Sequence, residues 1–128
     1  MSDETREYDR EYARPLPGAL SERVGIDTDR GRVTRFLVQL EYYHDDARHV
    51  VVRYDHDPEG PEEMSHDVTE EGLHMDIYRD GEKVATEFVT GPLATEVAID
   101  TAEEHLAENL EWFVRRYEEW HGIENGAL

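Results

Sequence analysis

Hydrophobic and polar side chains alternate along residues 33–43, which is the pattern of a β-strand with one buried face. A second alternating segment, residues 49–55, is rich in β-branched valines, and a short polar stretch separates the two. This spacing predicts a β-hairpin. The positions that share its predicted buried face are Phe36, Val38, Leu40, Tyr42, Val50, Val52 and Tyr54.

A second hairpin is predicted after a long loop. The loop, residues 56–72, is rich in proline, glycine and acidic residues, and loops of this length are often functional. Strands are predicted at residues 73–79 and 82–89, on either side of Asp80-Gly81, which is a favoured two-residue hairpin turn. We expect Leu73 and every second residue after it to face the core.

From Ala94 to Trp120, hydrophobic residues recur at every third or fourth position, which predicts a long amphipathic helix. The helix starts either near Pro92 or at Thr101, which would form a capping box with Glu104. Gly122 is a plausible end, and we expect residues 123–128 to fray.

Residues 1–31 are polar, and their few hydrophobic residues are spaced about four apart. They predict a polar N-terminal arm, with a short helix as an alternative. The remaining residues, 32–122, predict a single α+β domain. Its expected architecture is a four-stranded antiparallel meander with a long C-terminal helix packed on one face.

The chain of 128 residues is very acidic, with 32 Asp and Glu against 13 Lys and Arg, and its formal charge is −19. Such a charge repels itself in dilute buffer, but in molar salt the screening length falls to about 3 Å. Because Lys83 is the only lysine, we expect a protein adapted to the high-salt cytosol of a haloarchaeal-type organism.

Composition also excludes several classes of protein. There is no cysteine, which excludes disulfide frameworks, thiol nucleophiles and cysteine-based zinc sites. No hydrophobic run approaches the roughly 20 residues of a membrane helix, and the first residues do not resemble a signal peptide. We therefore expect a soluble, cytoplasmic protein with no membrane partner.

Alternation along the strands places Arg53, Asp55, His74 and Asp76 on the sheet face opposite the helix. If the 56–72 loop folded over this open face, these residues could form a catalytic site. His74 would act as general acid or base, Asp55 or Asp76 would orient it, and Arg53 would stabilise phosphate charge. Cross-strand pairs of this kind also stabilise sheets without any function, so the sequence does not decide whether the protein is an enzyme.

Histidines also raise the alternative of a divalent-metal site, for which His56, His66 and His74 are the candidate ligands. No recognised metal-ligand spacing is present, so no cofactor is the first expectation.

The run Val51-Val52-Arg53-Tyr54-Asp55, then His74-x-Asp76, then a helix with Asn109-Leu110-Glu111-Trp112, resembles a family of small archaeal and bacterial proteins of unknown function. More distantly, the Arg-Tyr-Asp strand followed by histidines is similar to TumE-type toxins of toxin–antitoxin pairs. The resemblance covers roughly residues 33–118. It implies functional roles for Arg53, Tyr54, Asp55, His74 and Asp76.

Three functions are consistent with these features. The first is an interaction or accessory protein that forms a homodimer or binds a protein partner. The second is a toxin-like ribonuclease or nucleotide-modifying enzyme, for which RNA would be the substrate. The third is a divalent-metal binder.

Overall fold

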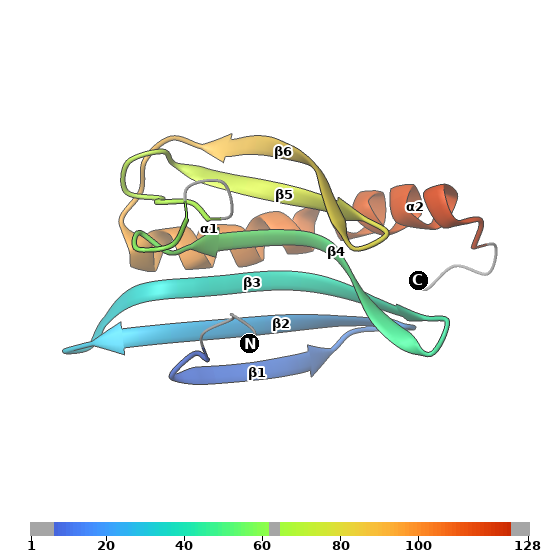
Figure 1. Cartoon of the computed structure of the whole chain (residues 1–128), viewed down its shortest axis with the longest axis horizontal. Helices are drawn as coiled ribbons and strands as arrows, with labels where there is room; N and C mark the ends of the chain where they lie inside the picture. The colour runs from blue at the N-terminus through green and yellow to red at the C-terminus, as the bar shows by residue number, and fades with distance from the viewer. Residues whose placement is uncertain (1–6, 62–64, 124–128) are drawn as a thin grey trace.

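The computed structural model describes residues 7–61 and 65–123. Its strands form one antiparallel sheet in which each strand is hydrogen-bonded to the next along the chain (Figure 1). The strands are β1 (Arg10–Pro15), β2 (Leu20–Asp29), β3 (Arg32–His44), β4 (Ala47–His56), β5 (Leu73–Arg79) and β6 (Glu82–Thr90). Two helices, α1 (Thr95–Glu108) and α2 (Leu110–His121), follow and lie along one face of the sheet. The fold is therefore α+β.

The prediction of four strands is wrong, because the sheet has six. The residues expected to form a polar arm or short helix contribute β1 and β2. All of β1 is exposed at the sheet edge, so it carries no buried stripe that a sequence pattern could reveal. A spacing of four also fits a strand, whose faces repeat every second residue, and Tyr12 in fact pairs with Val24 across the β1–β2 hairpin. Residues 1–6 lie outside the described part of the chain.

Hairpin turns join β2 to β3, β3 to β4 and β5 to β6. Each has two residues at positive φ: Arg30-Gly31 (53° and 80°), Asp45-Asp46 (53° and 62°) and Asp80-Gly81 (54° and 81°). Turns of this kind match the right-handed twist of the flanking strands. The turn predicted at Asp80-Gly81 is confirmed.

The prediction of a single long helix is also wrong, because the chain leaves the helical conformation at Asn109, where φ is −112°. The Asn109 side chain donates a hydrogen bond to the carbonyl of His105, and α2 begins at the next residue. Neither predicted start is correct, since α1 begins at Thr95. Thr101 does not cap the helix, because its hydroxyl donates to the Val97 carbonyl inside α1. The end at Gly122, whose φ is 65°, is confirmed.

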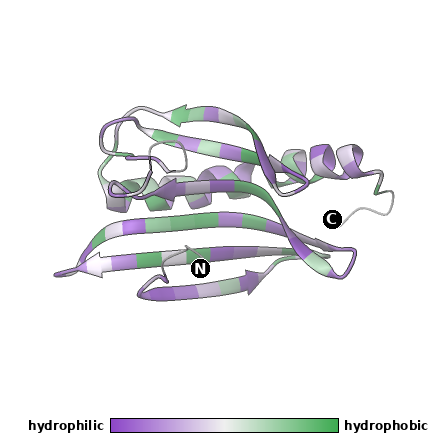
Figure 2. Cartoon of the chain, viewed as in Figure 1, coloured by the Kyte–Doolittle hydropathy of each residue, from purple (hydrophilic) through white to green (hydrophobic). Residues whose placement is uncertain are grey.

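The core lies between the sheet and the helices. α1 packs mainly against β3, and α2 packs against β4. Tyr54 and Tyr42 reach across this layer, where their hydroxyls are 2.8 Å from Nδ1 of His105 and 2.7 Å from Oε2 of Glu118. Figure 2 shows the contrast between β3, which is largely hydrophobic, and the edge strand β1, which is largely hydrophilic. Within the described residues, no helix combines the length and hydrophobicity that crossing a membrane requires.

Candidate functional site

The open face of the sheet, opposite the helices, carries two buried carboxylates. Asp76 on β5 pairs with Arg53 on β4, and continuing this antiparallel register places Asp55 opposite His74. Asp55 is 8% exposed and Asp76 is 1% exposed. The four residues predicted from strand alternation therefore do lie together on this face.

The loop between β4 and β5 folds back over this face and brings His66 to the carboxylates. Nε2 of His66 lies 3.2 Å from Oδ1 of Asp76, and Nδ1 lies 3.4 Å from Oε1 of Glu71. The ring of His66 stacks on that of His74, with centroids 5.2 Å apart and planes 9° apart. We call the residues Asp55, His66, Glu71, His74 and Asp76 the open-face cluster.

Backbone hydrogen bonds hold the loop in this position. The Asp57 amide donates to the His66 carbonyl at 2.8 Å. Further along, the Val68 amide donates to Nδ1 of His56, and the Val68 carbonyl accepts from the Leu93 amide. The loop is thus tied both to the end of β4 and to the segment that leads into α1.

Asp55 is the unusual member of the cluster. Its Oδ1 atom is buried and has no hydrogen-bond partner among residues 7–61 and 65–123. Burial raises the pKa of Asp55 to about 7, and the nearby charge of Asp76 raises it further, while His66 and Arg53 act in the opposite direction. This carboxyl group is therefore close to its protonation equilibrium at neutral pH.

Asp76, by contrast, is held in its ionised state. Burial acts to raise its pKa, but hydrogen bonds from His66 and from Thr86, whose hydroxyl is 2.7 Å away, outweigh it and lower the pKa. The Lys83 ammonium group lies 3.7 Å from Oδ2. In return, the hydrogen bond to Asp76 raises the pKa of His66 to about 9, against the effect of burial. His66 and Asp76 form an ion pair at neutral pH.

Arg53 lies beside the cluster and is half-buried. Its Nη1 donates to the Tyr78 hydroxyl at 3.4 Å, and its buried Nε has no partner in the described part of the chain. Tyr8 covers the neighbouring part of the face, where the guanidinium of Arg35 lies 3.8 Å from its ring centre. Tyr8 can lie there because Gly25 has no side chain: a Cβ at that position would be 2.6 Å from the ring.

Of the predicted metal ligands His56, His66 and His74, the structure brings His66 and His74 together but not His56. His56 points to the other face of the sheet, where its ring stacks on Phe36 at 5.9 Å. Its Nδ1 accepts a hydrogen bond from the Val68 amide, and burial lowers its pKa. Adjacent residues in a strand face opposite sides, so Asp55 lies in the open-face cluster while His56 does not.

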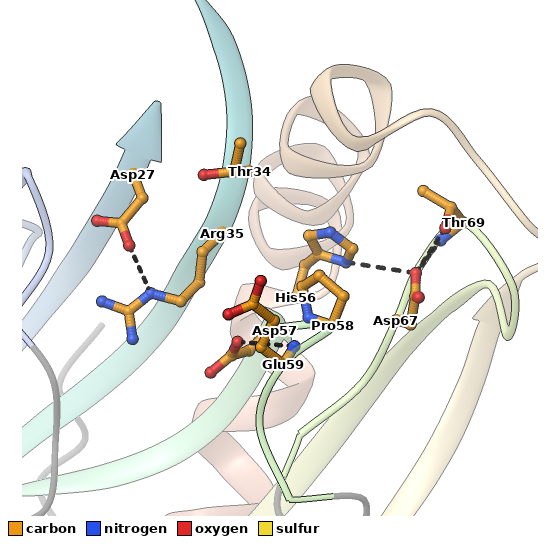
Figure 3. A pocket seen from close by; sticks show the side chains of 9 residues that line it. All are labelled: Asp27, Thr34, Arg35, His56, Asp57, Pro58, Glu59, Asp67 and Thr69. Atoms are coloured by element: carbon orange, nitrogen blue, oxygen red, sulfur yellow. Dashed lines mark hydrogen bonds and ion pairs between the residues drawn. The ribbon is translucent and has the colours of Figure 1, made fainter. Parts of the chain in front are cut away.

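His56 instead lines a pocket of about 430 Å³ at the end of β4 (Figure 3). Nδ1 of His56 is 3.9 Å from Oδ1 of Asp67, and across the pocket Arg35 donates to Asp27 at 2.8 Å. Besides Asp27 and Asp67, two more carboxylates line this pocket. Its walls contain few cations, so the pocket is acidic.

Within residues 7–61 and 65–123, two groups of side chains could hold a metal ion. In each group, one potential ligand atom per residue lies within 4.8 Å of the others. The inner group is Asp55, His66 and Asp76, and the outer group is His66, Glu71 and His74. His66 belongs to both groups and His74 to the outer one, and the sequence suggested both as ligands.

Sequence reasoning missed two polar contacts of the cluster. No pattern singles out Glu71 in a loop with many carboxylates. The contact of Thr86 was not predicted because an uninterrupted hairpin from Asp80-Gly81 would place Ala85, not Thr86, opposite Asp76. An irregularity between Ile77 and Tyr78 shifts the pairing by one residue, which brings Thr86 there instead.

These features define an α+β protein with a six-stranded antiparallel meander, two helices on one face, and a carboxylate–histidine cluster on the other. The chain belongs to the domain of unknown function family DUF7718, which matches residues 2–123. No curated protein and no solved structure matches the chain. The match agrees with the expectation of a family of unknown function, while the relationship to TumE-type toxins stays a prediction.

Proposed function

We propose that this protein binds a divalent metal ion at Asp55, His66 and Asp76. The observation that most supports this is the buried Oδ1 atom of Asp55, which lacks a hydrogen-bond partner among the described residues. Buried polar atoms nearly always have a partner. A cation held between Asp55, His66 and Asp76 would supply the missing one and would offset the repulsion between the two carboxylates.

The donor set suggests the class of metal. One imidazole nitrogen and two carboxylate oxygens suit Zn²⁺, Mn²⁺ or Fe²⁺ better than Ca²⁺ or Mg²⁺, which prefer oxygen ligands alone. Metal–ligand bonds of roughly 2.0–2.2 Å place ligand atoms about 3.5 Å apart. The three atoms lie within 4.8 Å of one another, so any pair needs to approach by about 1 Å at most, which side-chain rotation can supply.

Acid–base cleavage of RNA would use the same residues, but a phosphodiester would have to reach them. Asp55 and Asp76 are almost fully buried, and His66 from the loop lies against Asp76. A bare ion reaches such a position more readily than a nucleotide does. The toxin-like activity therefore stays a prediction, as does the role of an interaction or accessory protein with a partner.

We also propose that the protein works in a high-salt cytosol. The support is the combination of a net charge of −19 with a continuous hydrophobic core, which self-repulsion would oppose in dilute buffer. Its metal binding should accordingly be measured in molar KCl, where surface carboxylates are screened and attract cations only weakly.

The test is to titrate the metal-free protein with Zn²⁺ and Mn²⁺ in molar KCl and to follow the melting temperature. Binding to the folded state alone stabilises it by about 2.7 kcal/mol at one hundred times the Kd, so a clear rise is expected. Asp55→Asn should reduce the rise, because a neutral amide is a poor ligand. The control Asp45→Asn, whose side chain is 89% exposed in the β3–β4 turn, should keep it. No rise in the wild-type protein at millimolar metal would contradict the proposal.

A further inference from the structure

His66 faces a different acidic group with each of its two ring nitrogens. Nε2 is directed to Asp76, in the proposed inner site, and Nδ1 is directed to Glu71, on the side of the loop. The inner residues Asp55 and Asp76 are buried, whereas Glu71 is exposed and His74 is half-buried. The ring of His66 thus stands between a buried and an accessible group of ligands.

The outer group has the composition of a metal site in its own right. His66, Glu71 and His74 offer two imidazoles and one carboxylate, the combination that many zinc sites use. Ligand atoms from all three lie within 4.8 Å of one another, without any change of backbone.

His74 already makes the backbone contact that leaves one ring nitrogen for a metal. Its Nδ1 lies 3.3 Å from the Gly72 carbonyl oxygen, so an Nδ1–H donates there and Nε2 remains for a metal. Metal-binding histidines commonly donate their other N–H to a backbone carbonyl in this way. Gly72 is needed at this point, because its φ is 89° and a Cβ would lie 2.1 Å from the Thr90 carbonyl oxygen.

A small acidic crevice gives solvent access to this side of His66. Its volume is about 150 Å³, and its walls include His66 and Glu71 together with Asp67 and Glu70. The carboxylates would favour the entry of a cation over that of an anion. An ion could therefore reach the outer group before the buried one.

We propose that the outer group is a second metal site and that His66 bridges the two ions through its imidazole ring. This inference rests on the proposed function of the inner site. The charges balance: Asp55, Asp76, Glu71 and a bridging imidazolate carry one negative charge each, against two divalent ions, and the ring protons of His66 pass to solvent. The rings of His66 and His74 must turn out of their parallel stack, because a metal lies in the plane of each imidazole that binds it.

The test counts bound ions in the whole chain, by equilibrium dialysis with Zn²⁺ in molar KCl and by native mass spectrometry. The wild-type protein should bind two ions. His74→Gln and Glu71→Gln should each bind one, Asp55→Asn should bind one at the outer site, and His66→Ala should bind none. The control is His121→Gln, at the far end of α2, which should bind two.

Copper tests the bridge itself. With two equivalents of Cu²⁺, a shared imidazolate couples the two spins, so the electron paramagnetic resonance signal of isolated Cu²⁺ should be largely lost. Two ions with independent signals would overturn the bridge. One ion in the wild type, unaffected by His74→Gln, would overturn the second site and leave the proposed function standing. No bound ion would overturn both.

Discussion

Histidine rings gather at both ends of the sheet, with different surroundings. At one end lies the open-face cluster, beside the loop between β4 and β5. At the other end, where the β3–β4 hairpin meets the end of α2, lies a second group that we call the aromatic cluster (Figure 1). Its members are Tyr42, His44, His49, Tyr117 and His121.

The aromatic cluster is held by stacking and by hydrogen bonds, and the carboxylates next to its histidines are exposed. Nε2 of His121 lies 3.0 Å from Oδ1 of Asp80, which is 74% exposed, and Nδ1 of His44 lies 3.4 Å from Oδ2 of Asp45, which is 89% exposed. The rings of His44 and His49 stack at 4.2 Å, and those of Tyr117 and His121 stack at 4.0 Å. Nε2 of His44 meets the Tyr117 hydroxyl at 2.9 Å, and Nδ1 of His121 meets the Tyr117 carbonyl at 2.8 Å. The His44 contact joins the hairpin to the helix and the His121 contact lies within α2, so both have a structural role.

The open-face cluster differs because His66 lies against the buried carboxylate of Asp76, and a buried oxygen of Asp55 has no hydrogen-bond partner among the described residues. Proximity of histidines therefore does not by itself identify a binding site. What distinguishes the two groups is the electrostatic imbalance at Asp55, whose pKa is raised to about 7. The comparison predicts that changes in the aromatic cluster affect folding alone, while changes in the open-face cluster affect metal binding as well.

The largest expected effect is in the aromatic cluster. Tyr117 is 1% exposed, so Tyr117→Ala leaves a large cavity and should lower the free energy of unfolding by about 4 kcal/mol. Tyr117→Phe keeps the ring and should cost only about 1 kcal/mol, for the lost hydrogen bond. Urea unfolding in molar KCl measures both. Loss of metal binding by the folded Tyr117→Phe variant would contradict the separation of the two clusters.

In the open-face cluster of the metal-free protein, substitutions of two carboxylates should change the free energy of unfolding in opposite directions. Asp76→Ala removes the buried carboxylate that faces the charge of His66 and should lower the free energy of unfolding by about 3 kcal/mol. Asp55→Asn removes the cost of burying a carboxylate and should raise that free energy above pH 7. The same urea experiment compares the two, and equal losses would show that Asp55 is an ordinary structural residue.

A smaller effect, on the order of 2 kcal/mol, is expected from pH. Burial raises the pKa of Asp55 from 3.8 to about 7, and the hydrogen bond to Asp76 raises that of His66 from 6.5 to about 9. A pKa that is higher in the folded chain favours folding only while the group is protonated. The metal-free protein should therefore lose stability as pH rises, through the range 4–7 for Asp55 and 6.5–9 for His66.

Urea unfolding between pH 5 and pH 9 in molar KCl measures this loss. Asp55→Asn should flatten the profile below pH 7 and move the part due to His66 to lower pH, because the charge of Asp55 helps to raise the pKa of His66. Stability that rises with pH over this range would contradict the charge states assigned to both residues.

Sequence patterns identified β3 to β6, because each of these strands alternates or is bounded by a recognisable turn. They did not identify β1 and β2. β1 has no buried residue, and its hydrogen bonds to β2, which no side-chain pattern records, place it in the sheet. The break at Asn109 was also missed, because the hydrophobic repeat continues through it from Leu106 to Phe113.

For the site, the sequence by itself determined which residues of a strand share a face, since alternation is a local property of extended chain. That was enough to place Arg53, Asp55, His74 and Asp76 together and to separate the helix-covered face from the open one. The distance between His66 and Asp76, and the loss of solvent around Asp55, depend on how the loop closes over the sheet. Only the tertiary structure decided these, because pKa values and ligand geometry follow from groups that are distant in sequence and adjacent in space.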